Sequence, residues 1–212
     1  MNCLLIGIIT GSCAILSLLL IIKIDPGYYT VDVKGSAVLI VCSTLAVYFY
    51  QPDLDNGLHE AFKSLSFLTA LWFLLTVSYT DQKTKEFSTF ILAMGFLSQI
   101  IILLEVNCFI KSFVIHSNMI RDIIIAVAIS FILSLFCYSK GDFLILCVIF
   151  LNFLIQQGYF LQRVFILMTV SFCLFTICNI KNIVKLKKER RLRLPFTAYI
   201  AIGFVATNAL YR

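Results

Sequence analysis

Charged side chains are scarce in this chain. Only 13% of its 212 residues are Asp, Glu, Lys or Arg, whereas ordinary soluble chains carry about 25%. Hydrophobic residues make up 61% of the sequence, and the mean hydropathy is +0.99. This composition excludes a soluble globular domain and predicts a protein that crosses a lipid bilayer several times.

Paired cysteine motifs, internal repeats and long linkers are also missing. The eight cysteines form no C-x-x-C pair, and most of them lie in apolar runs, where cysteine acts as a small hydrophobic residue. The pattern is not that of a disulfide scaffold or a zinc site. Because no linker separates two domains, residues 1–212 are expected to form a single integral membrane domain.

The apolar runs predict an all-α, polytopic bundle of membrane helices. The first run lacks a preceding basic segment and a small-residue cleavage site, so we expect a retained span rather than a signal peptide. The second and sixth runs are short, so the expected number is about eight spans, within a range of six to eight. The eight runs are Cys3–Ile24, Gly35–Tyr50, Phe62–Tyr79, Phe87–Val106, Ile120–Cys137, Gly141–Gln157, Tyr159–Asn179 and Pro195–Tyr211.

Lys and Arg are unevenly distributed between the two sides of such a bundle. Twelve of the 17 lie on one side, seven of them between Lys181 and Arg193, and five lie on the other. The positive-inside rule places the richer side in the cytoplasm, so both termini are expected outside a multi-pass cell membrane protein. Topology or binding to anionic lipid accounts for the charge of +6, and no nucleic-acid partner is expected.

Two aspartates stand at the borders of apolar runs on the same predicted side. Asp81 ends the third run and Asp142 opens the sixth, with two complete spans between them. Extended from Ser139 to Gly158, the sixth run reaches the roughly 20 residues that a bilayer requires, and Asp142 then lies about one turn inside the boundary. An ionisable residue is costly there and marks a candidate functional site.

A pair of carboxylates in a partly desolvated site does not easily ionise twice. One carboxyl can stay protonated while the other acts as a base, so that a water between them attacks an amide carbonyl, as in aspartic proteases. The simpler interpretation is that Asp81 and Asp142 cap helix ends, because Asp is a favoured capping residue. Gly141 either permits an unusual backbone and a close approach of another chain, or is an ordinary helix-turn glycine.

The other polar residues in or near the spans are expected to have structural roles. Gln99 and Asn152 lie within spans and are predicted to hydrogen-bond across helices. His59 and His116 fall in outward loops, which excludes a Ser-His-Asp arrangement on the cytoplasmic side.

Three short motifs follow one another along the second part of the chain. They are an Asp-containing first motif, a GxGD-like motif and an apolar-Pro-Phe helix start with a later Gly: Asp81–Thr89, Ser139–Asp142, and Leu194–Tyr199 with Gly203. These motifs resemble, in the same order, those of the type IV prepilin peptidases, which share a GxGD motif with the presenilin-like intramembrane aspartyl proteases. The resemblance covers about residues 62–212.

The resemblance implies a membrane aspartic endopeptidase that uses a water activated between Asp81 and Asp142. Its substrate would be a pilin-like precursor of a pilus, secretion or DNA-uptake system, with a short basic leader cut at the cytoplasmic membrane boundary. Gly141, Pro195 and Phe196 would support the site without taking part in the chemistry. No metal or organic cofactor is implied.

Members of the family that also methylate carry a cytoplasmic domain with paired C-x-x-C motifs between their first spans. The first cytoplasmic loop here is only about Asp25–Lys34, so neither a zinc-binding domain nor methyltransferase activity is expected. The chain departs from the family pattern at Ser139, Leu144 and Ser88-Thr89, where Gly, Lys and Pro-Asn are usual.

The alternative is a non-enzymatic polytopic membrane protein. A small transporter is expected to show inverted repeats or interrupted helices, and neither is visible in the sequence. The departures from the motifs leave a catalytically inactive relative of the peptidases open.

Overall fold

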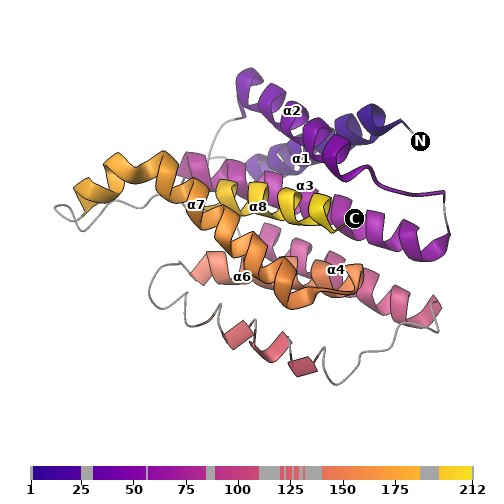
Figure 1. The fold of residues 1–212 in the computed structure, drawn as a ribbon. Coiled ribbons are helices and arrows are strands. Elements are labelled where there is room, and N and C mark those ends of the chain that lie inside the picture. Colours follow the sequence, from indigo (N-terminus) through magenta and orange to yellow (C-terminus); the bar gives the residue numbers. More distant parts are fainter. Residues whose placement is uncertain are drawn as a thin grey trace.

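The computed structural model is all-helical over the residues that it describes, which confirms the predicted fold class. These residues are 2–24, 31–55, 57–84, 89–109, 140–186 and 196–211, with several helical residues between 120 and 131. The helices described over their full bounds are α1 (Cys3–Ile24), α2 (Val33–Tyr50), α3 (Leu58–Thr84), α4 (Thr89–Phe109), α6 (Lys140–Gln156), α7 (Phe160–Leu186) and α8 (Thr197–Leu210) (Figure 1).

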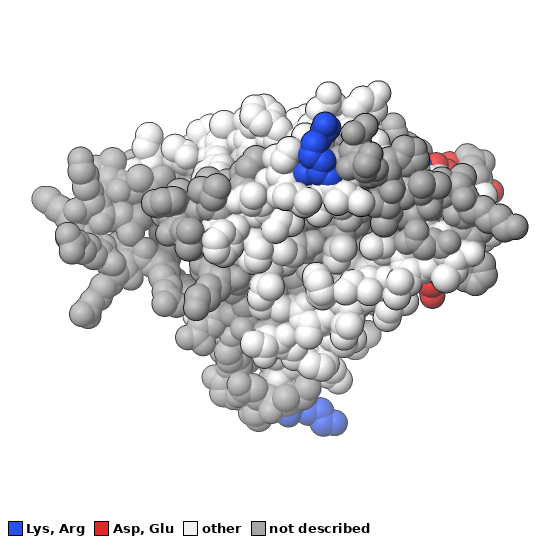
Figure 2. Space-filling model, turned by 90° about the horizontal axis from the view of Figure 1, so that it is seen from below, with Lys and Arg blue, Asp and Glu red and all other residues white. Residues whose placement is uncertain are grey.

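Five of the described helices are long and apolar enough to cross a membrane, namely α1, α2, α3, α4 and α7. The apolar helices α6 and α8 are shorter. Figure 2 shows a face on which the described residues are almost all uncharged, with only isolated acidic or basic groups. Large apolar side chains such as Leu16, Phe49 and Ile177 are exposed on the bundle, as expected where lipid replaces water. The chain is therefore a polytopic membrane protein.

Helices α3 and α7 extend furthest beyond their predicted apolar runs. Helix α3 runs from Leu58 to Thr84 and α7 continues to Leu186, because long polar side chains at a helix end can reach the aqueous interface while the backbone stays helical. Asp81 consequently lies inside the last turn of α3 rather than after it. His59 lies in the first turn of α3, so its predicted place in a loop was wrong. Most of the predicted run Ile120–Cys137, like His116, lies outside the described residues.

Helix α6 is shorter than expected. It has 17 residues, which span about 25 Å, and it does not extend to Gly158. The predicted extension was wrong because Gln157, Gly158 and Tyr159 all adopt positive φ angles, of 53°, 73° and 53°. These left-handed residues end α6 and reverse the chain into α7.

Helix α3 lies at the centre of the bundle. It contacts α1, α2, α4, α6 and α8, and Figure 1 shows α1 and α2 on one side of it and α4 and α6 on the other. Its Phe67 ring stacks on Tyr50 of α2 at 3.7 Å and on Phe204 of α8 at 5.4 Å between ring centroids. Because neighbours surround it, α3 is buried on most of its faces.

Small residues bring α1 and α2 close together. A Cβ atom added to Gly7 would lie 2.5 Å from the Cα atom of Thr44, and one added to Gly11 would lie 2.5 Å from Ser43 Oγ. The Ser43 hydroxyl donates a hydrogen bond to the carbonyl of Gly7 at 2.7 Å. This is the small-residue packing that lets membrane helices approach without a hydrophobic driving force.

Buried amides hold α3, α4 and α6 together. The Ser66 hydroxyl donates to Gln99 Oε1 at 2.7 Å and accepts from Asn152 Nδ2 at 2.7 Å. Gln99 Nε2 also donates to the Ser66 carbonyl at 3.1 Å and to the Thr69 hydroxyl at 2.8 Å. The predicted hydrogen bonding of Gln99 and Asn152 across helices is thus confirmed.

The same contacts show that α3 runs antiparallel to α6. Four residues beyond Asn152, Gln156 Nε2 donates to the carbonyl of Lys63, three residues before Ser66. The C-terminal end of α3 therefore meets the N-terminal end of α6, and the N-terminal end of α8 lies there too, because Thr197 contacts Asp81. We refer to these three helix ends together as the Asp81 end of the bundle.

Candidate functional site

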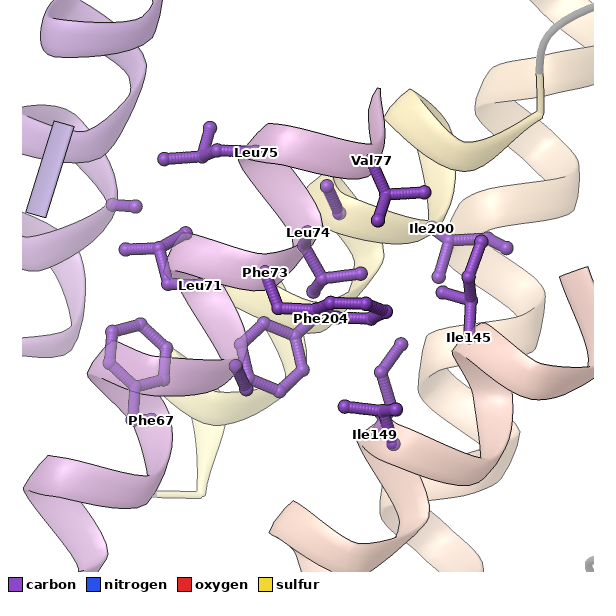
Figure 3. Packing of buried hydrophobic residues seen from close by; sticks show 14 of the residues in the cluster. Phe67, Leu71, Phe73, Leu74, Leu75, Val77, Ile145, Ile149, Ile200 and Phe204 are labelled. Carbon is purple, nitrogen blue, oxygen red and sulfur yellow. The ribbon is translucent and has the colours of Figure 1, made fainter. Parts of the chain in front are cut away.

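Asp81 belongs to the interior stripe of α3. Phe67, Leu74, Val77 and Asp81 recur at helical spacing and all are buried, with Asp81 only 6% exposed. Figure 3 shows Phe67, Leu74 and Val77 along α3, among side chains of α6 and α8. Asp81 therefore continues an apolar stripe that faces the centre of the bundle.

Asp142 occupies the matching position on α6. It lies in the first turn of that helix, is 6% exposed, and is followed on the same face by buried Ile145 and Ile149. Helix α6 begins at Lys140, so Asp142 is the third residue of the helix rather than the residue that precedes it.

A layer of aliphatic side chains separates both aspartates from the rest of the interior. Val77 of α3, Ile145 of α6 and Ile200 of α8 belong to one buried cluster, and Figure 3 shows them between the three helices. Val77 precedes Asp81 by one turn and Ile145 follows Asp142 by about one turn. The two carboxylates thus share the same end of one apolar core.

The hydrogen bond between Asn152 and Ser66 marks a common level on α6 and α3. From this level Asp142 lies about 15 Å back along α6 and Asp81 about 22 Å forward along α3, at about 1.5 Å per residue. Asp81 is therefore about 7 Å nearer to the end of the bundle than Asp142. The tilt of side chains reduces this offset. Because Cα–Cβ bonds lean toward a helix N-terminus and the helices are antiparallel, Asp81 leans inward and Asp142 leans outward.

The Asp81 carboxylate reaches α8. Its Oδ2 atom accepts a hydrogen bond from the backbone N–H of Thr197, the first residue of α8, at 3.3 Å. Phe196 precedes the helix and provides no side-chain cap. Asp81 therefore supplies from α3 the acceptor that a local N-cap residue usually provides.

Helix ends also determine the electrostatic surroundings of the two acids. Asp81 lies in the last turn of α3, where the partial negative charge of the helix end disfavours a carboxylate, but it faces the positive N-terminal end of α8. Asp142 lies at the N-terminal end of its own helix, which favours a negative charge. Each acid therefore has a helix N-terminus beside it.

No family model, no curated protein and no solved structure matches this chain.

Phe196 anchors the start of α8 against α7. Its ring contacts those of Phe172, Phe175 and Tyr199, with centroid distances of 5.5, 5.0 and 6.5 Å. Further along α8, a Cβ atom on Gly203 would lie 2.9 Å from the carbonyl oxygen of Leu167, so the two helices approach closely. Aromatic packing at one point and a glycine contact at the next place the N-terminus of α8 beside Asp81.

The remaining motif residues are placed as follows. Gly141 lies in the first turn of α6 and is helical. Leu144 is 45% exposed on the outside of the bundle, so its departure from the family pattern does not change the interior. Pro195, Ser139 and Ser88 lie outside the described residues.

A second polar contact lies at the Asp81 end, on the face of α3 toward α2. Asp32 precedes α2 and accepts hydrogen bonds from the Gly35 N–H at 3.0 Å and the Tyr79 hydroxyl at 3.2 Å. Lys83 Nζ lies 3.8 Å from its other oxygen. The Gly35 N–H, with help from Tyr79 and Lys83, holds the pKa of Asp32 below its usual value.

The opposite end of the bundle carries a buried arginine. Arg163 is 3% exposed, and its guanidinium donates to Asn208 Oδ1 at 3.1 Å and to the Tyr211 carbonyl at 2.8 Å. It lies in the first turn of α7, inside the bundle. His59 is also at this end, about 33 Å along α3 from Asp81.

Sequence reasoning did not single out Thr197 or Asp32. The available signal was their residue type, because Thr and Asp are common at helix starts. Residue type alone does not indicate that Thr197, at the start of α8, contacts the carboxylate of Asp81. Within the described residues, no three His, Cys, Asp or Glu side chains are grouped as a metal site would require.

Proposed function

We propose that this chain is a membrane aspartic endopeptidase whose catalytic groups are Asp81 and Asp142. The observation that carries this proposal is that both carboxyl groups are buried on the interior faces of adjacent antiparallel helices, at the same end of the bundle. Burial of two acids in an apolar core is costly, and such groups in membrane helices mark functional sites.

The reaction needs one acid in each protonation state. One carboxylate removes a proton from a water while the other carboxyl group donates a proton to the amide carbonyl oxygen, and the peptide bond is then hydrolysed. Two carboxyl groups that share a desolvated site favour one shared proton over two charges. No metal ion or organic cofactor enters this scheme.

The substrate follows from the family resemblance and from the distribution of charge. With twelve of 17 basic residues on its side, the Asp81 end would face the cytoplasm and both termini the outside. A pilin-like precursor, with a short basic leader before an apolar helix, would present its cleavage site at that membrane boundary. The apolar helix would lie in the bilayer, and the leader would remain in the cytoplasm.

The test is cleavage of a labelled pilin-like precursor by membranes that contain the chain or a variant. Asp81→Asn and Asp142→Asn keep the size of each side chain but remove its acid–base function. We expect each single variant to lose cleavage by at least about 100-fold, because general acid–base catalysis contributes roughly 10²–10⁴. Asp55→Asn, an exposed acid in the loop before α3, is the matched control and should cleave normally.

The catalytic role of the Asp81 and Asp142 pair is refuted if either Asn variant processes the precursor at the wild-type rate. Equal membrane levels of all variants, checked by immunoblotting, exclude a trivial loss of protein. A wild-type chain that cleaves no pilin-like precursor, at levels where a known peptidase does, also contradicts the proposal.

One observation favours the non-enzymatic alternative. Asp81 caps the N-terminus of α8, and this contact gives the carboxylate a structural role without any chemistry. The cap does not explain the burial of Asp142, which belongs to a different helix. The Asp142→Asn variant therefore separates the two functions: loss of cleavage with an unchanged thermal midpoint supports the enzyme.

A further inference from the structure

Thr197 begins α8 and is fully buried against Asp81, with 0% of its surface exposed. Its backbone N–H donates to Asp81 Oδ2 at 3.3 Å. Its position is determined by its neighbours in the chain, since Phe196 packs on the aromatic rings of α7 and Ile200 packs in the core.

The hydroxyl of Thr197 differs from those of three other buried threonines. Thr10, Thr76 and Thr207 donate to the carbonyl four residues earlier in their own helices, at 2.9, 2.8 and 2.7 Å. Thr197 is the first residue of its helix, so no such helical carbonyl precedes it. Its Oγ1 atom is buried and has no hydrogen bond of good geometry within the described part of the chain.

The Asp81 carboxylate, which already accepts the N–H of the same residue, is a neighbouring acceptor for this hydroxyl. A buried hydroxyl without an acceptor is costly, so a small rotation of the side chain toward the carboxylate is favourable. Two donors from one residue, the N–H and the hydroxyl, would then hold the carboxylate on its α8 side. These two hydrogen bonds would fix the orientation of the Asp81 carboxylate relative to α6, the helix that carries Asp142.

We propose that Thr197 is a positioning residue that orients the Asp81 carboxylate toward the reacting water. This inference rests on the proposed peptidase function for its kinetic part, whereas the contact itself does not. A carboxylate in a catalytic pair must be held within a fraction of an ångström, because small misplacements of a reacting group reduce the rate strongly.

The kinetic test compares Thr197→Val with Thr197→Ser. Valine keeps the shape and removes the hydroxyl, while serine keeps the hydroxyl. We expect Thr197→Val to lower kcat for the pilin-like precursor by about 10- to 100-fold with little change in KM, and Thr197→Ser to restore most of it. Thr207→Val is the matched control on the same helix, since Thr207 is also fully buried but bonds only within α8.

A second measurement does not depend on activity. The thermal midpoint in detergent is determined for Thr197→Val, for Asp81→Ala and for the double variant. If the hydroxyl acts through Asp81, Thr197→Val lowers the midpoint by about 2–4 °C in the wild-type background and by about 1 °C or less once Asp81 is alanine. If Thr197→Val does not accumulate, Thr197→Ala replaces it in both experiments.

The outcomes separate the two proposals. Thr197→Val with wild-type kcat, or Thr197→Ser no better than Thr197→Val, overturns the positioning role. If Thr197→Val lowers the thermal midpoint equally with Asp81 present and with Asp81→Ala, the contact between Thr197 and Asp81 is overturned. If the wild-type chain cleaves no precursor while the thermal cycle shows coupling, the proposed function fails but the contact between Thr197 and Asp81 stands.

Discussion

The Asp81 carboxylate in the last turn of α3 accepts a hydrogen bond from the backbone N–H of Thr197, 116 residues later in the chain, at 3.3 Å. This contact gives the N-terminus of α8 a hydrogen-bond acceptor and gives the buried Asp81 carboxylate a donor. Helix α8 has no side-chain cap of its own, and Asp81 lies at the helix end that disfavours a negative charge. The same carboxylate is therefore a structural cap and, in the proposed function, half of a catalytic pair.

The cap predicts different effects for two substitutions of Asp81. Asp81→Ala should lower the free energy of unfolding by about 1 kcal/mol, the usual cost of losing an N-cap, and the thermal midpoint by about 2–4 °C. Asp81→Asn should cost less, because an amide oxygen can still accept from the Thr197 N–H. Thermal unfolding in detergent measures both, and equal midpoints for alanine and wild type would argue against the cap.

The cluster of Ser66, Gln99 and Asn152, which we call the Ser66 cluster, is expected to contribute to stability and not to catalysis. Ser66→Ala removes the hydroxyl that contacts both Gln99 and Asn152, so these buried amides each lose one partner. We expect a cost of about 1 kcal/mol, since hydrogen bonds between membrane helices contribute about 0.6–2 kcal/mol. Ser98→Ala is the control, because the Ser98 hydroxyl bonds only to Gly95 in its own helix. A midpoint of Ser66→Ala no lower than that of Ser98→Ala would contradict the role of the cluster.

The contacts of Arg163 predict that lysine at this position gives a less stable protein than arginine. The guanidinium uses two nitrogens to reach Asn208 and the Tyr211 carbonyl, and a single ammonium does not reproduce that fork. Arg163→Lys should therefore lower the free energy of unfolding by about 1.5–3 kcal/mol. Gln162→Ala, a change at the exposed neighbouring position, should cost much less. Equal thermal midpoints for the two variants would show that the paired hydrogen bonds of the Arg163 guanidinium are dispensable for stability.

Asp32 predicts a dependence of stability on pH. Its pKa is lowered in the folded protein, chiefly by the Gly35 N–H. A lowered carboxyl pKa stabilises the fold above the unfolded value of about 3.9, and this contribution is lost as the pH falls through the folded value. Asp32→Ala should thus have a lower thermal midpoint than wild type at pH 7, and the difference should shrink below about pH 4. Asp32→Asn keeps a capping oxygen and should lie between the two. A difference that stays constant from pH 7 to pH 3 would contradict this assignment.

The apolar parts of the helices were predictable because they depend on local composition. The apolar run Cys3–Ile24 became α1 with the same bounds, and the run Gly35–Tyr50 became all but the first two residues of α2. The errors lie at helix ends, where polar residues extend α3 to Thr84 and left-handed residues stop α6 at Gln156. Neither effect is visible in hydropathy, which does not register the backbone conformation.

Burial of single polar residues was less predictable. The sequence places Arg163 near the start of the run Tyr159–Asn179 but does not show that it is buried, because burial requires Asn208 and the Tyr211 carbonyl to accept its hydrogen bonds. Leu144 departs from the family pattern but faces outward, where an apolar side chain suits a lipid environment. The face that a residue presents depends on how its helix packs, and this depends on the whole bundle.

The sequence by itself determined that the chain is a bundle of membrane helices and that Asp81 and Asp142 are separated by two spans. Both properties depend on composition and on counting segments, which are local or additive. Only the tertiary structure decided that the first residue of α8 meets Asp81, and that Asp142 shares its apolar core. Contacts across 116 residues arise from the packing of Phe196 on α7 and of α8 on α3, and packing is a property of the assembled helices.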